Sequence, residues 1–191
     1  MITQELRNKT EENHLRLEQS PILLPLSEGS LTRDNYIVIL QHFYGFFQPL
    51  ESALQAFAIH THLPDFASRR KASLLSIDLK ALLGSDYTTP TLSNSLPDIE
   101  NISQAMGCLY VMEGSTLGGK MIYNRVQQHL GLDYTNGASF FYGYGSETGQ
   151  KWKSFQQALI SFSSTFHTDQ DIITAANDTF TTFKKWLDTG Q

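Results

Sequence analysis

The sequence has little cysteine and no excess of positive charge. Its 191 residues include one cysteine, Cys108, so no disulfide can form within the chain, which fits a reducing compartment. The formal net charge of −5 argues against a nucleic-acid partner, because phosphate binding needs a basic face. Cys108 lies in an apolar stretch, residues 106–112, with no neighbouring histidine, and we interpret it as a core residue rather than a nucleophile.

Long apolar runs are also missing. No stretch approaches the roughly 20 apolar residues that a membrane-spanning helix requires. The N-terminal segment MITQELRNKTEENH carries charges where a signal peptide needs its apolar region. We therefore expect no membrane span, no export signal of an obvious kind and a cytoplasmic location. Because no repeat or long linker interrupts a chain that is 40% hydrophobic, we also expect a single domain over residues 1–191.

Hydrophobic residues recur every three or four positions through most of the chain. This pattern predicts an all-α fold, a single-domain irregular helical bundle, and no segment alternates as a strand does. Pro49 is expected to kink or divide the second helix, which follows the N-cap candidate Thr32. The expected helices cover residues 3–19, 33–54, 66–83 and 98–130 and two C-terminal segments from Trp152 and Ile172, with irregular stretches at 85–97 and 131–147.

Three glycines, Gly114, Gly118 and Gly119, lie inside the expected helix 98–130. Each costs a helix about 0.5–1 kcal/mol relative to alanine, so their presence needs a reason. The four-residue spacing would let another helix pack closely. Alternatively, the adjacent pair would let the helix bend and bring bare backbone against a flat ligand. The adjacent pair favours the second interpretation, because a packing contact needs only one small residue per turn.

His14 lies in the first expected helix, on the side of Leu6 and Leu17, so we expect it to point inward. A lone histidine on an apolar face is more often a core residue than a metal ligand. Two neighbours favour the ligand: Arg7 lies two turns earlier and Glu18 one turn later. A metal-bound histidine generally donates its other ring N–H to a carboxylate, a carbonyl or water, and Glu18 can accept it.

The same histidine ends the sequence Glu11-Glu12-Asn13-His14, which contains half of a di-iron carboxylate motif. Such sites need the Glu-x-x-His motif on two helices. None of the other five histidines has a glutamate three residues before it. The di-iron interpretation therefore fails.

These segments together resemble the haem oxygenase family, and in particular its bacterial branch. LRNKTEENHLRLE resembles the family's proximal helix, and YVMEGSTLGGKMI resembles its glycine-rich distal helix. SFFYGYGSETGQKWKSFQQAL and AANDTFTTFKKWL resemble the two C-terminal helices and their lead-in. The match covers nearly the whole chain in the expected order. The E-G-S-T-L-G-G and F-x-G-Y-G segments are similar to those of phytochrome-associated members.

The resemblance implies that His14 is the only protein ligand of the haem iron and that Glu18 orients its ring. It implies further that Arg7 and Lys153 bind the haem propionates and that Thr10 contacts the ring from the same side. Phe180 would line the propionate side of the pocket. The implied cofactor-binding set is Arg7, Thr10, His14, Glu18, Gly114, Gly118, Gly119, Lys153 and Phe180.

On the opposite side of the haem, the resemblance implies a kinked distal wall formed by Gly114, Gly118 and Gly119, with Ser115 among the catalytic positions. Several family members have an aspartate at the Ser115 position, where it organises water near bound oxygen. The bacterial branch commonly lacks this acid. Tyr110 is one residue out of register with a tyrosine that some relatives use for a propionate.

The implied activity is oxidative cleavage of haem, which is both substrate and cofactor, to biliverdin, carbon monoxide and ferrous iron. In such a reaction dioxygen binds the iron, and electrons come from an external ferredoxin or reductase. Two purposes are open: supply of biliverdin to a bilin acceptor such as a bacterial phytochrome, and recovery of iron from haem. One alternative is a haem carrier without ring-opening activity, favoured by the missing distal acid. Another is a thiaminase-like protein, which needs a cysteine in a polar pocket, whereas Cys108 has apolar neighbours.

Overall fold

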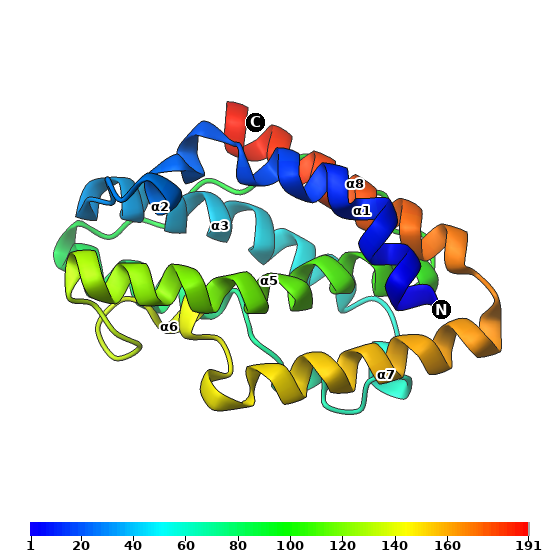
Figure 1. Cartoon of the computed structure of the whole chain (residues 1–191). Coiled ribbons are helices and arrows are strands. Elements are labelled where there is room, and N and C mark those ends of the chain that lie inside the picture. The colour runs from blue at the N-terminus through cyan, green and yellow to red at the C-terminus, as the bar shows by residue number, and fades with distance from the viewer. Residues whose placement is uncertain (191) are drawn as a thin grey trace.

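The computed structural model describes residues 1–190, which form eight α-helices and five short 3-10 helices without a β-strand (Figure 1). The prediction of an all-α bundle is therefore confirmed. The α-helices are α1 (Ile2–Glu18), α2 (Leu24–Glu28), α3 (Arg33–Leu54), α4 (Ser73–Leu83), α5 (Ile102–Leu130), α6 (Ser139–Tyr142), α7 (Thr148–Phe166) and α8 (Asp169–Thr189). The 3-10 helices are η1 (Pro21–Leu23), η2 (Ile59–Thr61), η3 (Phe66–Ser68), η4 (Gly84–Asp86) and η5 (Gly145–Glu147). None of the helices within residues 1–190 is long and apolar enough to cross a membrane.

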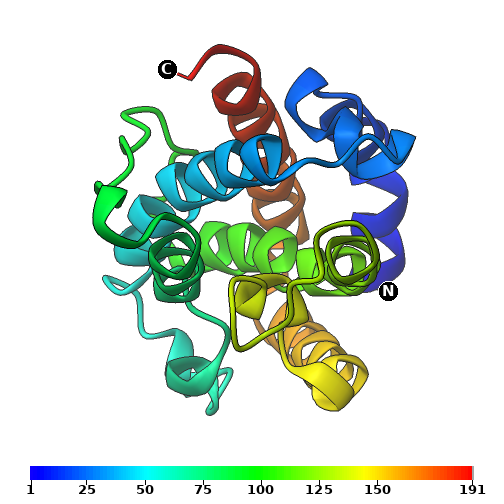
Figure 2. The same cartoon turned by 90° about the vertical axis from the view of Figure 1, so that its left-hand side faces the viewer.

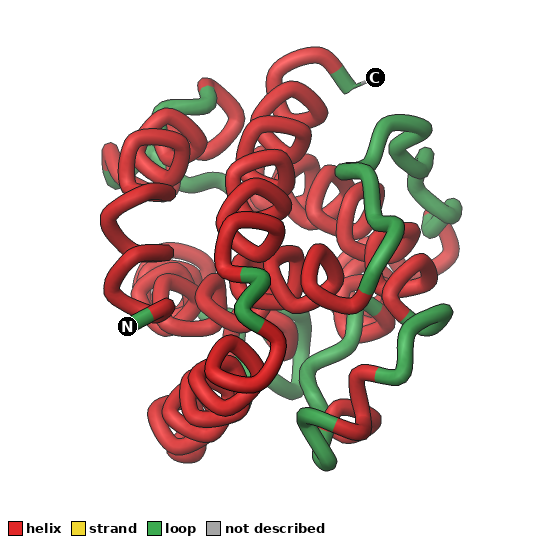
Figure 3. The backbone as a smooth tube through the Cα atoms, turned by 90° about the vertical axis from the view of Figure 1, so that its right-hand side faces the viewer, coloured by secondary structure: helices red, strands yellow, loops and turns green. Residues whose placement is uncertain are grey.

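Helix α5 runs through the middle of the molecule, and the other helices surround it (Figure 2). Its most extensive contact is with α8, which in turn packs against α1. Helices α3 and α4 pack against each other, and the long loops gather on the side of the molecule away from α1 (Figure 3). Helix α8 thus lies between α1 and α5 and contacts both of them.

Side-chain caps mark where the two longest helices, α3 and α5, begin. The Thr32 hydroxyl accepts a hydrogen bond from the Asn35 N–H, as expected for the start of α3. Asn101 caps α5 in the same way through Gln104, so this helix begins at Ile102 rather than at residue 98. The expected helix 66–83 begins only at Ser73, because a 3-10 turn and an extended segment precede it.

Pro49 does not divide α3, although division was one of the two outcomes expected from the sequence. The helix continues from Arg33 to Leu54 although proline cannot donate a hydrogen bond to the carbonyl four residues earlier, that of Gly45. The Ser93 N–H donates to this carbonyl instead, at 2.8 Å. A partner far away in sequence therefore satisfies the acceptor that the proline leaves free.

The hydrophobic core joins α3, α6 and α8 through stacked aromatic rings. Phe46 and Phe183 are 4.6 Å apart between centroids, and Phe43 meets Phe183 edge-on at 5.1 Å. Cys108 is fully buried in this core, and burial raises the pKa of its thiol to about 11. Its assignment as a core residue is confirmed.

Candidate functional site

Helix α1 is fixed on α8 along one face. Four of its side chains are buried, and a hydrogen bond of 2.6 Å joins Asn13 Nδ2 to Asn177 Oδ1 on α8. The buried residues of α1 are Ile2, Leu6, Thr10 and Leu17. The apolar contacts and the amide pair together define which side of α1 faces away from α8.

His14 lies at the edge of this buried face, not within it. We expected it to point inward beside Leu6 and Leu17, but its side chain is 52% exposed. Its ring meets Phe180 of α8 edge-on, with 5.5 Å between centroids. The helical repeat explains the difference, because His14 is rotated away from the centre of the stripe that Leu6 and Leu17 share. A half-exposed imidazole resting on an aromatic ring is accessible to a ligand.

Glu18 lies one turn after His14, as the spacing predicted. The distance from His14 Nε2 to Glu18 Oε1 is 3.7 Å, and both side chains are about half exposed. This separation is too long for a direct hydrogen bond, although a small rotation of either side chain closes it. The pair can therefore hold the imidazole with one nitrogen toward Glu18 and the other toward solvent.

The first half of α1 meets α5 at Tyr110. Burial raises the pKa of the Tyr110 hydroxyl, while a hydrogen bond with Thr10 and the charge of Arg7 act in the opposite direction. The Tyr110 ring also lies 5.6 Å from that of Trp152 on α7. The structure thus brings Tyr110 together with two residues of α1, although sequence analysis set it aside as out of register.

Two exposed cations are available near this contact. Arg7 acts on Tyr110 through its charge, and Lys153 follows Trp152 on α7. Within the described chain, residues 1–190, neither Arg7 nor Lys153 forms a hydrogen bond or an ion pair. Both can therefore turn toward an anionic group.

One face of α5, which we call the open face, combines bare backbone with exposed apolar side chains. It consists of Gly114, Leu117, Gly118 and Met121. Leu117 is 46% exposed and Met121 is 53% exposed. A Cβ atom at Gly118 would meet nothing within 4 Å, and at Gly114 it would meet only the Trp152 ring, at 3.6 Å. Large apolar side chains gathered on a surface mark an interaction site.

Gly119 does not belong to the open face. It is buried, and a Cβ atom there would lie 3.2 Å from the Phe141 carbonyl oxygen in α6. We expected Gly119 to share the distal wall with Gly114 and Gly118; in the structure it packs closely against α6 while Gly118 faces open space, and the contact of Gly119 with haem stays a prediction. Helix α5 continues without a break through all three positions.

The Ser115 hydroxyl is engaged within the protein. It accepts a hydrogen bond from Arg70 Nη2 at 2.6 Å and donates one to the Met112 carbonyl at 2.7 Å. Its only proton is therefore committed to a main-chain acceptor. Ser115 is a structural residue here, not a free proton donor.

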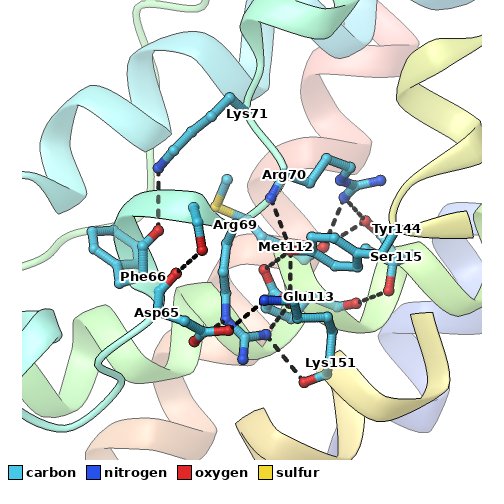
Figure 4. A network of polar contacts seen from close by, with 12 residues as sticks. Asp65, Phe66, Arg69, Arg70, Lys71, Met112, Glu113, Ser115, Tyr144 and Lys151 are labelled. Atoms are coloured by element: carbon cyan, nitrogen blue, oxygen red, sulfur yellow. Dashed lines mark hydrogen bonds and ion pairs between the residues drawn. The ribbon is translucent and has the colours of Figure 1, made fainter. Parts of the chain in front are cut away.

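Sequence analysis missed a polar cluster behind the open face. Glu113 is almost fully buried and pairs with Arg69 at 2.6 Å, while Tyr144 donates to the same carboxylate (Figure 4). A glutamate between Met112 and Gly114 in an apolar helix was a signal, since a buried carboxylate needs a partner. The identity of the partner could not be read from the sequence, because Arg69 lies 44 positions away.

Helices α1 and α5 come together at Tyr110 and then diverge, so that His14 and the open face lie on separating helices that both contact α8 (Figure 1). A family model described as "Heme oxygenase" matches residues 1–189 of this chain. The chain belongs to the haem oxygenase family.

Known haem oxygenases of bacteria are similar to the chain over almost their whole length. Heme oxygenase PigA of Pseudomonas aeruginosa is 28% identical over 187 residues, which cover 97% of this chain and 91% of the relative. The NO- and CO-bound heme oxygenase structures from Neisseria meningitidis share its fold with a TM-score of 0.82 at 22% identity, covering 98% and 90% of the two chains. Heme oxygenase from Leptospira interrogans gives 0.78 at 19% identity, covering 98% of each chain.

As a haem oxygenase, the chain is an oxidoreductase that binds haem and opens it, and iron and dioxygen take part in the reaction. The resemblance seen in the histidine-containing and glycine-rich segments is thereby confirmed. The carrier and thiaminase-like alternatives are set aside.

Proposed function

We propose that residues 1–191 act as one domain that binds haem between α1 and the open face of α5 and converts it to biliverdin, carbon monoxide and ferrous iron. The observation that supports this proposal is the combination of a half-exposed His14 with an apolar, side-chain-free strip at Gly114 and Gly118 on the diverging helix. A flat apolar ring with one free axial position needs both features. The continuous hydrophobic core supports treating the chain as one unit.

His14 is the only protein ligand to the iron in this proposal. Bound haem supplies an iron centre that activates dioxygen beside the meso carbons of its own ring. Glu18 accepts the second ring N–H of His14, which fixes the tautomer and the orientation of the imidazole. Phe180, edge-on to the imidazole at 5.5 Å, restricts rotation of the ring.

The open face holds the other side of the haem. Gly114 and Gly118 let the helix backbone approach the ring, because no Cβ atom intervenes. Bound haem covers Leu117 and Met121, which are otherwise exposed to water. This burial provides much of the binding free energy, about 25 cal/mol for each Å² of apolar surface removed from water. The same side chains exclude water from the space around the iron.

Arg7 and Lys153, together with Tyr110, orient the haem by its propionates. The two cations are exposed and unpaired within residues 1–190, and charge-assisted hydrogen bonds to carboxylates have defined directions. By holding bound haem in one orientation, Arg7, Lys153 and Tyr110 would set which meso carbon is oxidised. These residues therefore select the biliverdin isomer more than they determine affinity.

The reducing equivalents come from an external ferredoxin or reductase, because a chain with one cysteine, itself buried, cannot provide a dithiol. We place the reaction in the cytoplasm, in agreement with this reduced, buried thiol. The E-G-S-T-L-G-G segment, similar to that of phytochrome-associated members, supports supply of the bilin to a bacterial phytochrome.

Haem titration followed by turnover tests the proposal. The purified protein should bind one haem, and ascorbate or a ferredoxin system in air should replace the Soret band with biliverdin absorbance. His14→Ala should remain folded but lose the iron–nitrogen stretch of the histidine complex and nearly all turnover. His129→Ala, on the far end of α5, is the control and should behave as the wild type. A wild-type Soret band and stretch in His14→Ala would refute the assignment of this ligand.

A further inference from the structure

Two consecutive arginines reach one turn of α5 from behind the open face. Arg69 and Arg70 lie in the extended segment between η3 and α4 (Figure 4). Arg69 Nη1 donates to Glu113 Oε2 at 2.6 Å, and its Nε donates to Asp65 Oδ1 at 3.0 Å. The side chains of Arg69 and Glu113 are only 1% and 4% exposed, so this ion pair is shielded from water. Glu113 is therefore fixed relative to the segment before α4.

Arg70 holds the same turn through different atoms. Its Nη2 donates to the Met112 carbonyl at 2.8 Å and to Ser115 Oγ at 2.6 Å, and its guanidinium stacks over Phe140 at 4.1 Å. Its backbone N–H donates to the Tyr144 hydroxyl at 2.8 Å. We call Arg69 and Arg70 together the arginine clamp.

Tyr144 connects the two halves of the arginine clamp. Its hydroxyl accepts from the Arg70 N–H and donates to Glu113 Oε1 at 2.9 Å. A buried ion pair of this kind specifies geometry more than it adds stability, since desolvation offsets much of the attraction. Because the guanidinium N–H groups point in fixed directions, they allow only a small range of positions for α5 relative to the two arginines.

The residues held by the arginine clamp flank Gly114. Met112 and Glu113 precede it and Ser115 follows it, whereas Gly114 and Gly118 have no side chains with which to hold the helix in place. Rotation of α5 about its own axis is normally resisted by side chains on all of its faces. On the open face that resistance is missing, so near Gly114 the clamp adds to the hold that α8 and α6 have on the helix.

Extra donors also meet the carbonyls of this turn. The Met112 carbonyl accepts from both Arg70 and the Ser115 hydroxyl, and the Glu113 carbonyl accepts from the Thr116 hydroxyl at 2.6 Å. Side-chain donors at helical carbonyls compete with the backbone N–H four residues later and bend the helix. The competing N–H groups are those of residues 116 and 117, immediately before Gly118.

We propose that Arg69 and Arg70 are positioning residues that set the rotation and bend of α5, and so place the Gly114 and Gly118 backbone over the haem. This inference rests on the proposed haem site. Together with the propionate contacts, the clamp thereby affects which meso carbon is oxidised. Ser115 is held by the clamp through its hydrogen bond with Arg70, so its hydroxyl has a structural role at this position.

The first test uses the haem-free protein, so its outcome does not depend on the proposed site. In Arg70→Met, amide hydrogen exchange at residues 115–119 should be about ten-fold faster or more, the effect of losing a charge-assisted hydrogen bond. Residues 103–107, which pack against α8, should keep their protection. Arg70→Lys should be intermediate, since an ammonium group keeps the charge but lacks the planar fork. Arg33→Met, which removes an equivalent bond to the Leu82 carbonyl, is the matched control and should leave residues 115–119 unchanged.

The second test uses the haem complex. Arg70→Met should alter the ratio of biliverdin isomers and shift the pH of the acid–alkaline transition of ferric haem, with Arg70→Lys partly restoring both. Ser115→Ala should change them much less, because Arg70 still reaches the Met112 carbonyl. Unchanged exchange in haem-free Arg70→Met would overturn the clamp itself. Faster exchange with an unchanged isomer ratio and transition would overturn its role in positioning the distal face, whereas failure of wild-type turnover would count against the haem site instead.

Discussion

Gly107 and Gly118 lie on the same helix, and their surroundings are opposite. A Cβ atom at Gly107 would come within 2.3 Å of the Ile172 carbonyl oxygen, where α5 crosses α8. A Cβ atom at Gly118 would meet nothing within 4 Å. The first glycine allows two backbones to touch, whereas the second leaves backbone uncovered. Two glycines of the same helix thus differ: Gly107 permits close packing of two helices, and Gly118 leaves the backbone open where we propose that haem binds.

We expect the largest effect from a side chain at the tightly packed glycine, Gly107. Gly107→Ala forces the crossing of α5 and α8 apart, because the new methyl group would meet the Ile172 carbonyl, which is backbone and cannot rotate away. We expect the free energy of unfolding to fall by about 3 kcal/mol or more, beyond the usual range for overpacking. Urea denaturation followed by circular dichroism measures it. Stability equal to that of the wild type would mean that the two helices are not in contact at this point.

A large side chain at the open end should act on the reaction and not on the fold. Gly118→Leu places a branched side chain where the haem is proposed to lie, so we expect turnover to fall about ten-fold or more with helicity and His14 ligation retained. Biliverdin yield per haem and the iron–nitrogen stretch are the measurements. Gly149→Leu, at an exposed position of α7 where an added Cβ atom also meets nothing within 4 Å, is the control and should keep normal turnover. Normal yield from Gly118→Leu would remove this glycine from the distal side.

We expect the smallest effect, a difference in stability, when each of the adjacent glycines Gly118 and Gly119 is replaced by alanine. Gly118→Ala should raise the free energy of unfolding by about 0.5–1 kcal/mol, because alanine favours the helix and meets no neighbour. Gly119→Ala should gain less or lose slightly, since its methyl group would lie 3.2 Å from the Phe141 carbonyl oxygen. Thermal denaturation of both haem-free variants compares them. Equal stabilisation would show that α6 yields freely and that the two positions do not differ.

The sequence was sufficient for features that depend on neighbours along the chain. Helix periodicity predicted α1, α3 and α5, the Thr32 cap was found where expected, and the pairing of His14 with Glu18 followed from their spacing. Local signals were overruled where a distant group intervened. Pro49 was expected to kink or divide α3, and the helix is not divided; Ser93 satisfies the carbonyl that the proline leaves free.

For the candidate site too, the features that depend on nearby residues could be predicted from the sequence, and those that depend on distant residues could not. The glycine pair indicated bare backbone, yet which member is uncovered depends on α6, a short helix that carried no sequence signal. The exposure of His14 depends on how α1 rotates on α8, which Asn13 and Asn177 help to fix. The arginine clamp could not be foreseen, because its partners lie more than 40 positions away.

The fully buried Cys108 has a consequence for the durability of the enzyme. Burial raises the pKa of the thiol to about 11, so at neutral pH very little of it is the thiolate that oxidants attack. A haem oxygenase activates oxygen and releases ferrous iron in its own interior, conditions that convert exposed thiolates to sulfenic and higher acids. With its single sulfhydryl protonated and shielded by the core, the chain carries no cysteine that its own chemistry readily damages.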